Sequence, residues 1–140
     1  MKYLLDTCII SELRKPNPGP SVVEWVQSND EQHYYLSTLT FGELHKGIEK
    51  LPDSARKRNL HDWVEHELRD RFRNRILDVN IKVARIWGTV QAHSEREGKP
   101  MPAIDGLIAA TGIAYGLTVV TRNTADMESS GVLLFNPWKE

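Results

Sequence analysis

The sequence has a single cysteine, no long apolar run and no excess of positive charge, and each shortage excludes a class of protein. One cysteine, Cys8, cannot build a disulfide framework or a zinc site with several cysteine ligands. The apolar runs are far shorter than the ~20 residues that a membrane span needs. The first residues reach a carboxylate at Asp6, too early for the apolar core of a secretory signal. We therefore expect a cytoplasmic protein with no membrane partner.

The remaining composition is that of an ordinary folded domain. The chain has 140 residues, of which 40% are hydrophobic and 26% charged, so a sizeable core can form. This length favours one domain, covering residues 1–140, over two. The net charge is −1, whereas proteins that bind nucleic acids through their overall charge are usually basic. If this protein binds a polyanion, its positive charge must be local or come from a metal ion.

Short apolar runs alternate with segments of helical pattern. The expected strands span residues 2–5, 33–37, 76–79, 117–121 and 132–135. The expected helices span residues 9–13, 40–51, 53–74, 80–98 and 102–115, with a further helix that begins at Pro20. Continuous apolar strands between helices are typical of a parallel sheet covered on both faces. The sequence therefore predicts an α/β fold, in which ligands bind outside the carboxyl ends of the strands.

Four acidic residues fall at strand ends or helix starts, which parallel strands bring to one edge of the sheet. These residues are Asp6, Glu43, Asp105 and Asp126. Converging carboxylates repel one another and raise one another's pKa unless a cation joins them. A hard divalent ion such as Mg²⁺ or Mn²⁺ suits a site of carboxylates alone, and it can activate water and hold phosphate oxygens. The pattern therefore predicts metal-assisted hydrolysis of a phosphodiester.

Each of these acids also has an ordinary structural explanation. Asp6 could cap the helix that follows it, and Thr40 and Glu43 have the spacing of a capping box. Asp105 could complement a helix dipole, and Asp126 could be a solvated residue in the loop after the strand expected at residues 117–121. The hypothesis of a site depends on the shared edge and not on any one residue.

These acids lie in segments that resemble the PIN-domain family, in particular the VapC-type toxins of prokaryotic toxin–antitoxin pairs and the FitB-like proteins. The matching segments are residues 4–7, 36–40, 43–44 with Gly47, 103–111, 116–123 and 135–138. The segments around Asp105 and Thr121 are highly specific when taken together, whereas the segment around Asp6 alone is not. The resemblance spans essentially the whole chain.

The resemblance implies a PIN-like three-layer α/β/α sandwich with a central parallel sheet. It implies an endoribonuclease toxin that requires Mg²⁺ or Mn²⁺ and hydrolyses RNA. It further implies a cognate antitoxin of the VapB or FitA type that blocks the site, and a homodimer. Asp6, Glu43 and Asp105 match the family's three acidic residues, with Asp6 and Asp105 as the primary metal ligands. Glu43, with a fourth acid, is expected to hold a second ion or to orient the attacking water.

The position of the fourth acid stays open at this point. Asp126 matches it, but some relatives carry the acid where Asn123 stands here, so either residue could face the metal. Thr121 and Asn123 are expected to give polar support to the site. A further departure is Cys8, where the family most often has Asn after Asp-Thr, which predicts a weaker hydrogen bond in the loop of the first acid.

Other functions are compatible with parts of the sequence. Cys8 and Arg14 have the spacing of a tyrosine-phosphatase loop, but no glycine between them turns amides inward and Glu12 would repel a phosphate. An aspartyl-phosphate phosphatase would need a second Asp where Cys8 stands. A non-catalytic PIN-like binding protein, acting with an antitoxin-like partner in a complex that binds nucleic acid, stays open. In that case the carboxylates would only join loops.

A group of arginines lies near the end of the longest expected helix, at residues 69, 71, 73 and 75. Their spacing of two residues scatters them around the helix, which favours a solvated surface. The alternative is that some border the acidic edge and contact RNA phosphates or an antitoxin segment.

Overall fold

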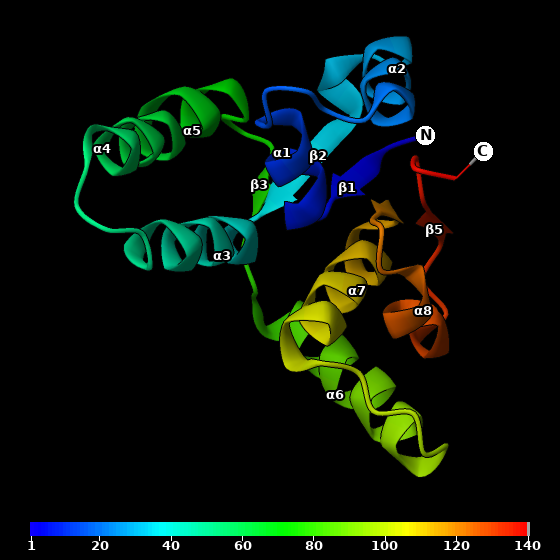
Figure 1. Cartoon of the computed structure of the whole chain (residues 1–140). Helices are drawn as coiled ribbons and strands as arrows, with labels where there is room; N and C mark the ends of the chain where they lie inside the picture. The colour runs from blue at the N-terminus through cyan, green and yellow to red at the C-terminus, as the bar shows by residue number, and fades with distance from the viewer. Residues whose placement is uncertain (140) are drawn as a thin grey trace.

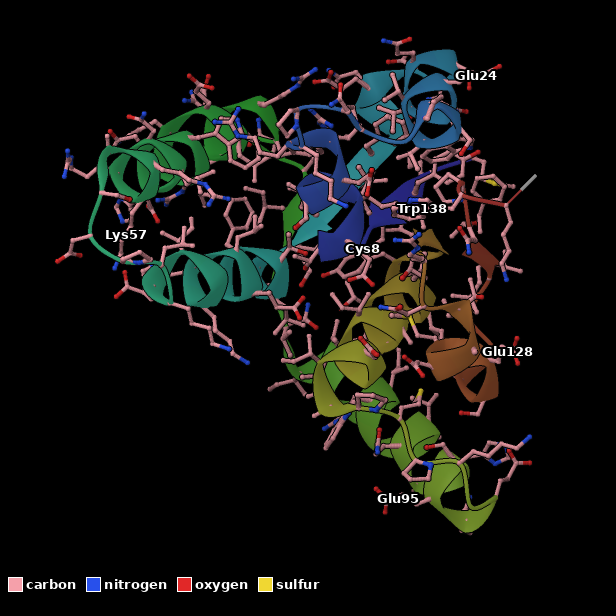
Figure 2. All side chains as sticks on the ribbon, in the orientation of Figure 1. Cys8, Glu24, Lys57, Glu95, Glu128 and Trp138 are labelled. Carbon is pink, nitrogen blue, oxygen red and sulfur yellow. The ribbon has the colours of Figure 1, made fainter. Side chains whose placement is uncertain are left out.

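A computed structural model describes residues 1–139 (Figure 1). Its elements are, in chain order, β1 (Tyr3–Leu5), α1 (Thr7–Leu13), α2 (Pro20–Ser28), η1 (Glu31–His33), β2 (Tyr34–Ser37), α3 (Thr38–Glu49), α4 (Ala55–Asp62), η2 (Trp63–Leu68), α5 (Arg69–Arg71), β3 (Ile76–Leu77), α6 (Ile81–Arg96), α7 (Ala103–Tyr115), β4 (Thr118–Val120), α8 (Thr124–Met127), η3 (Glu128–Ser130) and β5 (Leu134–Phe135). Charged side chains such as Glu24 and Glu95 point into solvent (Figure 2). Within these residues, none of the helices combines the length and the apolar composition that crossing a bilayer requires.

The five strands form one sheet in the order β3-β2-β1-β4-β5, and every neighbouring pair is parallel. The chain first builds one side of β1 with β2 and β3, and then crosses to the other side with β4 and β5. Because all strands run the same way, their carboxyl ends meet at one edge. The predicted parallel α/β fold is confirmed.

Two apolar cores cover the two faces of the sheet, because successive strand residues point to opposite faces. Leu5, Leu36 and Val120 belong to a core to which α1, η2 and Phe72 (directly after α5) contribute, with α2 and α3 packed against it. Leu4 and Val119 belong to a second core, to which α7 and α8 contribute. α6 packs along α7 (Figure 1). These layers give the expected α/β/α sandwich.

The single helix expected over residues 53–74 is interrupted. α4 begins only after Ser54, whose hydroxyl oxygen accepts a hydrogen bond from the Lys57 amide at 3.1 Å. The next segment, η2, is π-helical, and the chain leaves the helix before Asn74, which has a φ of 68°. β3 and β5 are also shorter than expected. Apolar periodicity does not distinguish a π-helical turn from an α-helical one, so the π-helical segment could not be predicted from it.

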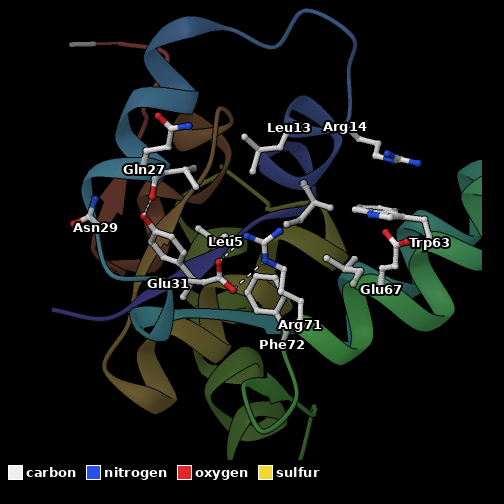
Figure 3. Close-up of a pocket in the computed structure, with 14 residues that line it drawn as sticks. Leu5, Leu13, Arg14, Gln27, Asn29, Glu31, Trp63, Glu67, Arg71 and Phe72 are labelled. Carbon is white, nitrogen blue, oxygen red and sulfur yellow. Dashed lines mark hydrogen bonds and ion pairs between the residues drawn. The ribbon is translucent and has the colours of Figure 1, made fainter.

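The arginines of this region do not form one surface. Arg71 makes two hydrogen bonds to the Glu31 carboxylate, at 3.0 and 2.7 Å, and Arg73 pairs with Asp70. The pair of Arg71 and Glu31 lies beside a pocket of about 460 Å³ between α1, the end of α2 and η2 (Figure 3). Arg75 is buried and donates to three backbone carbonyl oxygens, each at 2.7 Å. The expectation of a solvated arginine is therefore wrong for Arg75, because the helix has ended before it.

Candidate active site

The carboxyl edge of the sheet places the ends of β1 and β4 side by side. Leu5 pairs with Val120, and the amide of Asp6 donates to the carbonyl oxygen of Val120 at 3.0 Å. Asp6 and Thr121 therefore leave neighbouring strands at the same level. From here the chain continues to β2 on one side of β1 and to β5 on the other. Open α/β sheets form their ligand sites where the strand order reverses in this way.

Asp6 accepts hydrogen bonds at both of its carboxylate oxygens. Oδ1 accepts from the amide of Thr7 and Oδ2 accepts from the hydroxyl of Thr121, each at 2.8 Å. The first bond makes Asp6 the N-cap of α1. The predicted capping role is therefore confirmed, and Asp6 also lies at the sheet edge. Burial raises the pKa of Asp6 above its usual value, with a smaller contribution from the charge of Glu43, while the two hydrogen bonds act to lower it.

Glu43 is joined to the same edge through Thr7. The Thr7 hydroxyl lies 2.5 Å from Glu43 Oε1, to which it donates, and 3.2 Å from the hydroxyl of Thr40. The interpretation of Thr40 and Glu43 as a capping box is wrong, because α3 begins earlier than expected. Ser37 is its N-cap and accepts from the Leu39 amide at 3.0 Å. The Glu43 carboxylate is thus committed to the sheet edge and not to the helix end.

Asp105 lies in the first turn of α7, as predicted. Burial raises its pKa, and the negative charges of Asp6, Asp126 and Glu43 raise it further, to about 6. Within residues 1–139, no hydrogen bond or positive charge offsets this rise. The fold therefore places Asp105 in the electrostatic field of the three other candidate acids.

Asp126 and Asn123 lie after β4 and have different surroundings. Asp126 is exposed on the short helix α8, and not in a loop as predicted. Its charge contributes to the raised pKa of Asp105. The backbone amide of Asn123 donates at 3.0 Å to the hydroxyl of Thr121, which in turn donates to Asp6. Asp126 thus acts on the site through its charge, and Asn123 through its backbone.

Cys8 belongs to the same hydrogen-bond network. Its Sγ accepts from the amide of Arg122 at 3.4 Å and lies 3.7 Å from the hydroxyl of Thr121. Burial raises the pKa of the thiol, and the charge of Asp6 adds to the rise, so the sulfur is an uncharged partner in the network and not only a small apolar side chain. The segment from Cys8 to Arg14 is helical, which does not form the phosphate-binding loop of a tyrosine phosphatase.

Basic side chains share a hollow with Glu43, one of the four acids. An open hollow of about 920 Å³ is lined at one place by Thr7 and Glu43 and elsewhere by Arg14, Lys15 and Arg56. These three residues belong to the end of α1, the turn after it and α4. Arg14 and Lys15 are adjacent in the sequence, whereas tertiary packing brings Arg56 and Glu43 to the same hollow, so sequence spacing does not reveal it.

The acids share one field without converging on one point. Within residues 1–139, no three His, Cys, Asp or Glu side chains lie close enough to hold one metal ion as they are placed. Two hydrogen bonds fix the carboxylate of Asp6, whereas among residues 1–139 none restrains that of Asp105. The Asp105 side chain can therefore rotate without breaking a hydrogen bond to any of these residues. These carboxylates repel one another unless a cation lies between them. Their oxygen atoms are ligands that suit a hard divalent ion.

Comparisons with known proteins identify the family of the chain and several of its relatives. The family profile described as the PIN domain matches residues 3–128. The chain is 38% identical over 137 residues to Toxin FitB of Neisseria gonorrhoeae, covering 98% of this chain and 99% of that protein. It is 33% identical over 136 residues to VapC ribonuclease Y4jK of Sinorhizobium fredii, covering 97% of each. A solved structure of FitAB bound to a DNA fragment superposes with a TM-score of 0.93 at 36% identity, covering 99% of this chain and 96% of that one.

The raised pKa of Asp105 predicts a pH-dependent stability difference between the wild type and Asp105→Asn in the presence of EDTA. The folded-state pKa of about 6 exceeds the unfolded value of 3.8, so the folded protein retains a proton that the unfolded chain has lost. The wild type therefore loses stability as the pH rises from about 4 to 7, and the asparagine variant is spared this loss. In thermal unfolding, the unfolding temperature of the variant should rise relative to that of the wild type as the pH increases from 4 to 7.

The matched control for this measurement is Asp53→Asn, since the side chain of Asp53 is 99% exposed. Its unfolding temperature should follow that of the wild type at every pH. A difference between Asp105→Asn and the wild type that stays constant from pH 4 to 7 would contradict the assigned environment of Asp105.

Proposed function

The chain belongs to the PIN-domain family, and from this premise we propose that it is a VapC-type toxin, an endoribonuclease that hydrolyses RNA phosphodiester bonds with Mg²⁺ or Mn²⁺. The observation that carries the proposal is the environment of Asp105, an unrestrained carboxyl group whose pKa is raised to about 6 by burial and by three other acids. The ribonuclease name of the relative Y4jK supports the same activity.

The metal would be held by Asp6 and Asp105, with Glu43 and Asp126 completing the acidic pocket. Oxygen ligands of this kind are those that Mg²⁺ and Mn²⁺ prefer. When bound, such an ion lowers the pKa of water and neutralises charge on phosphate oxygens. It would also supply the positive charge that a chain of net charge −1 does not have.

The residues around the acids have separate tasks in this mechanism. Thr121 and Thr7 hold Asp6 in one orientation through their hydrogen bonds to its two oxygens. Thr7 also holds Glu43, which would orient the attacking water or a second ion. Asp105 has a pKa of about 6 without a metal, and a bound cation would lower that pKa and favour the ionised carboxylate.

The hollow beside the acids gives RNA a path to them. Arg14, Lys15 and Arg56 line it together with Thr7 and Glu43, so phosphates can contact cationic side chains while one phosphodiester lies at the acidic edge. Such contacts position a nucleic acid without reading its sequence. They satisfy the requirement, set by the composition, that positive charge be concentrated locally.

Regulation by a partner follows from the same family membership. We expect a cognate antitoxin of the VapB or FitA type to block the acidic edge, and we expect the toxin to form a homodimer. The solved FitAB structure is bound to DNA, which favours a second role for the complex in binding DNA. A non-catalytic protein acting only in such a complex is the alternative, and loss of cleavage in a site variant distinguishes the two.

Asp105→Asn should reduce RNA cleavage by more than about 100-fold, because it removes a ligand charge at the centre of the site. The variant should still fold, since the wild-type carboxylate makes no hydrogen bond to residues 1–139 that would be lost. Cleavage of total cellular RNA with Mg²⁺, with Mn²⁺ and with EDTA measures the effect, and Asp53→Asn is the control. Wild-type rates for Asp105→Asn in Mg²⁺ would exclude the proposed mechanism.

Arg14→Ala and Arg56→Ala should each weaken RNA binding and reduce the slope of log affinity against log salt concentration by about one, because one phosphate contact is lost. Arg73→Ala is the matched control, since Arg73 is exposed and paired with Asp70 away from the hollow. Binding is measured with EDTA present so that no cleavage occurs. Equal slopes for all three variants and the wild type would show that RNA does not follow this hollow.

A further inference from the structure

Two side chains of α6 contact the backbone immediately after Asp105. A Cβ atom placed on Gly106 would lie 2.9 Å from Gln91 Oε1 and 3.1 Å from Trp87 Nε1. A methyl group at residue 106 would therefore force the amide end of Gln91 and the ring of Trp87 to shift. The glycine therefore allows α6 to approach the first turn of α7 at the residue next to the candidate metal ligand.

Gln91 also holds the chain just before this turn. Its Nε2 donates at 3.1 Å to the carbonyl oxygen of Met101 and at 3.2 Å to the carboxylate of Glu95. The bond to a carbonyl oxygen fixes the orientation of the amide, because only its nitrogen can donate. One side chain thus contacts the backbone on both sides of Asp105, at Met101 and at Gly106.

The polar atoms that contact Gly106 are unusual in having no partner. Trp87 Nε1 and Gln91 Oε1 are both buried, and neither makes a hydrogen bond within the described residues. An unpaired buried donor or acceptor costs stability. Packing alone would be served better by apolar side chains of the same size. Proteins accept such costs mainly where a site requires a particular arrangement.

We propose that Trp87 and Gln91 are positioning residues that set the place of the Asp105 carboxylate through the backbone of Gly106. The proposal rests on the proposed function, in which Asp105 ligates a divalent ion. Asp105 has no hydrogen-bond partner of its own among residues 1–139, so the location of its carboxylate depends on the backbone that carries it. α6 holds that backbone in place while leaving the side chain free to turn toward the ion.

Gly106→Ala tests this directly, and Gly112→Ala is its matched control on the same helix. A Cβ on Gly112 would lie 2.8 Å from Val119 Cγ2 and 2.9 Å from Val132 Cγ2, so this position is more crowded than Gly106 but faces the sheet. Both variants should lower the unfolding temperature. Only Gly106→Ala should weaken Mn²⁺ binding to the metal-free protein, by about tenfold or more in calorimetry, and lower kcat for RNA with little change in KM.

Gln91→Leu tests the same positioning role if Gly106→Ala does not fold. It retains most of the side-chain volume but loses the hydrogen bond to Met101, so Mn²⁺ binding should weaken several-fold. Glu95→Ala removes only the exposed partner of the same amide and should bind Mn²⁺ as the wild type does. In Gly106→Ala combined with Trp87→Phe, the smaller ring makes room for the new methyl group and should restore part of the Mn²⁺ affinity.

The outcomes separate this inference from the proposed function. Wild-type Mn²⁺ affinity in both Gly106→Ala and Gln91→Leu, with only their unfolding temperatures lowered, would reduce Trp87 and Gln91 to packing residues and leave the nuclease intact. Equal loss of affinity in Gly106→Ala and Gly112→Ala would also overturn the positioning role. A wild-type protein that neither binds Mn²⁺ nor cleaves RNA would remove the proposed function itself, and the inference with it.

Discussion

Mutual repulsion among carboxylates at one end of a parallel sheet is the constraint on which the rest of this structure depends. The residues that follow parallel strands lie at a single edge of the sheet, and in this protein several of them are acidic. Burial and neighbouring charges raise the pKa of Asp105 to about 6, a condition that costs stability once the group ionises. An arrangement with this cost is explained if a cation compensates it in the working protein.

The surroundings of the acids divide into fixed and movable parts. Asp6 caps α1 and accepts from Thr121, so its position is set by β1, β4 and the helix start together. Asp105 is placed only by its backbone, which α6 approaches closely at Gly106. A site with one rigid and one adjustable ligand can stay open without a metal and close when the metal binds. This division fits the finding that no three candidate ligands within residues 1–139 are grouped tightly enough to share one ion as placed.

The sequence predicted the parts of the molecule that follow from local chemistry. Short apolar runs identified β1, which ends just before Asp6, and β4, and Pro102 identified the start of α7 before Asp105. The predictions from the sequence were wrong where packing between distant segments sets the local structure. Ser37, not Thr40, caps α3 because β2 ends there, and Arg75 is buried because the preceding helix ends early. The roles of Thr7 and Arg14 depend on packing between elements distant in sequence, which no spacing reveals.

The proposed mechanism requires that Asp6 and Asp105 share one divalent ion. An anomalous difference map from crystals of the protein grown with Mn²⁺ tests this requirement. We expect a peak between these residues, within about 2.0–2.4 Å of a carboxylate oxygen of each. Saturating Mn²⁺ that leaves no peak there, or that binds only to exposed carboxylates elsewhere, would contradict it.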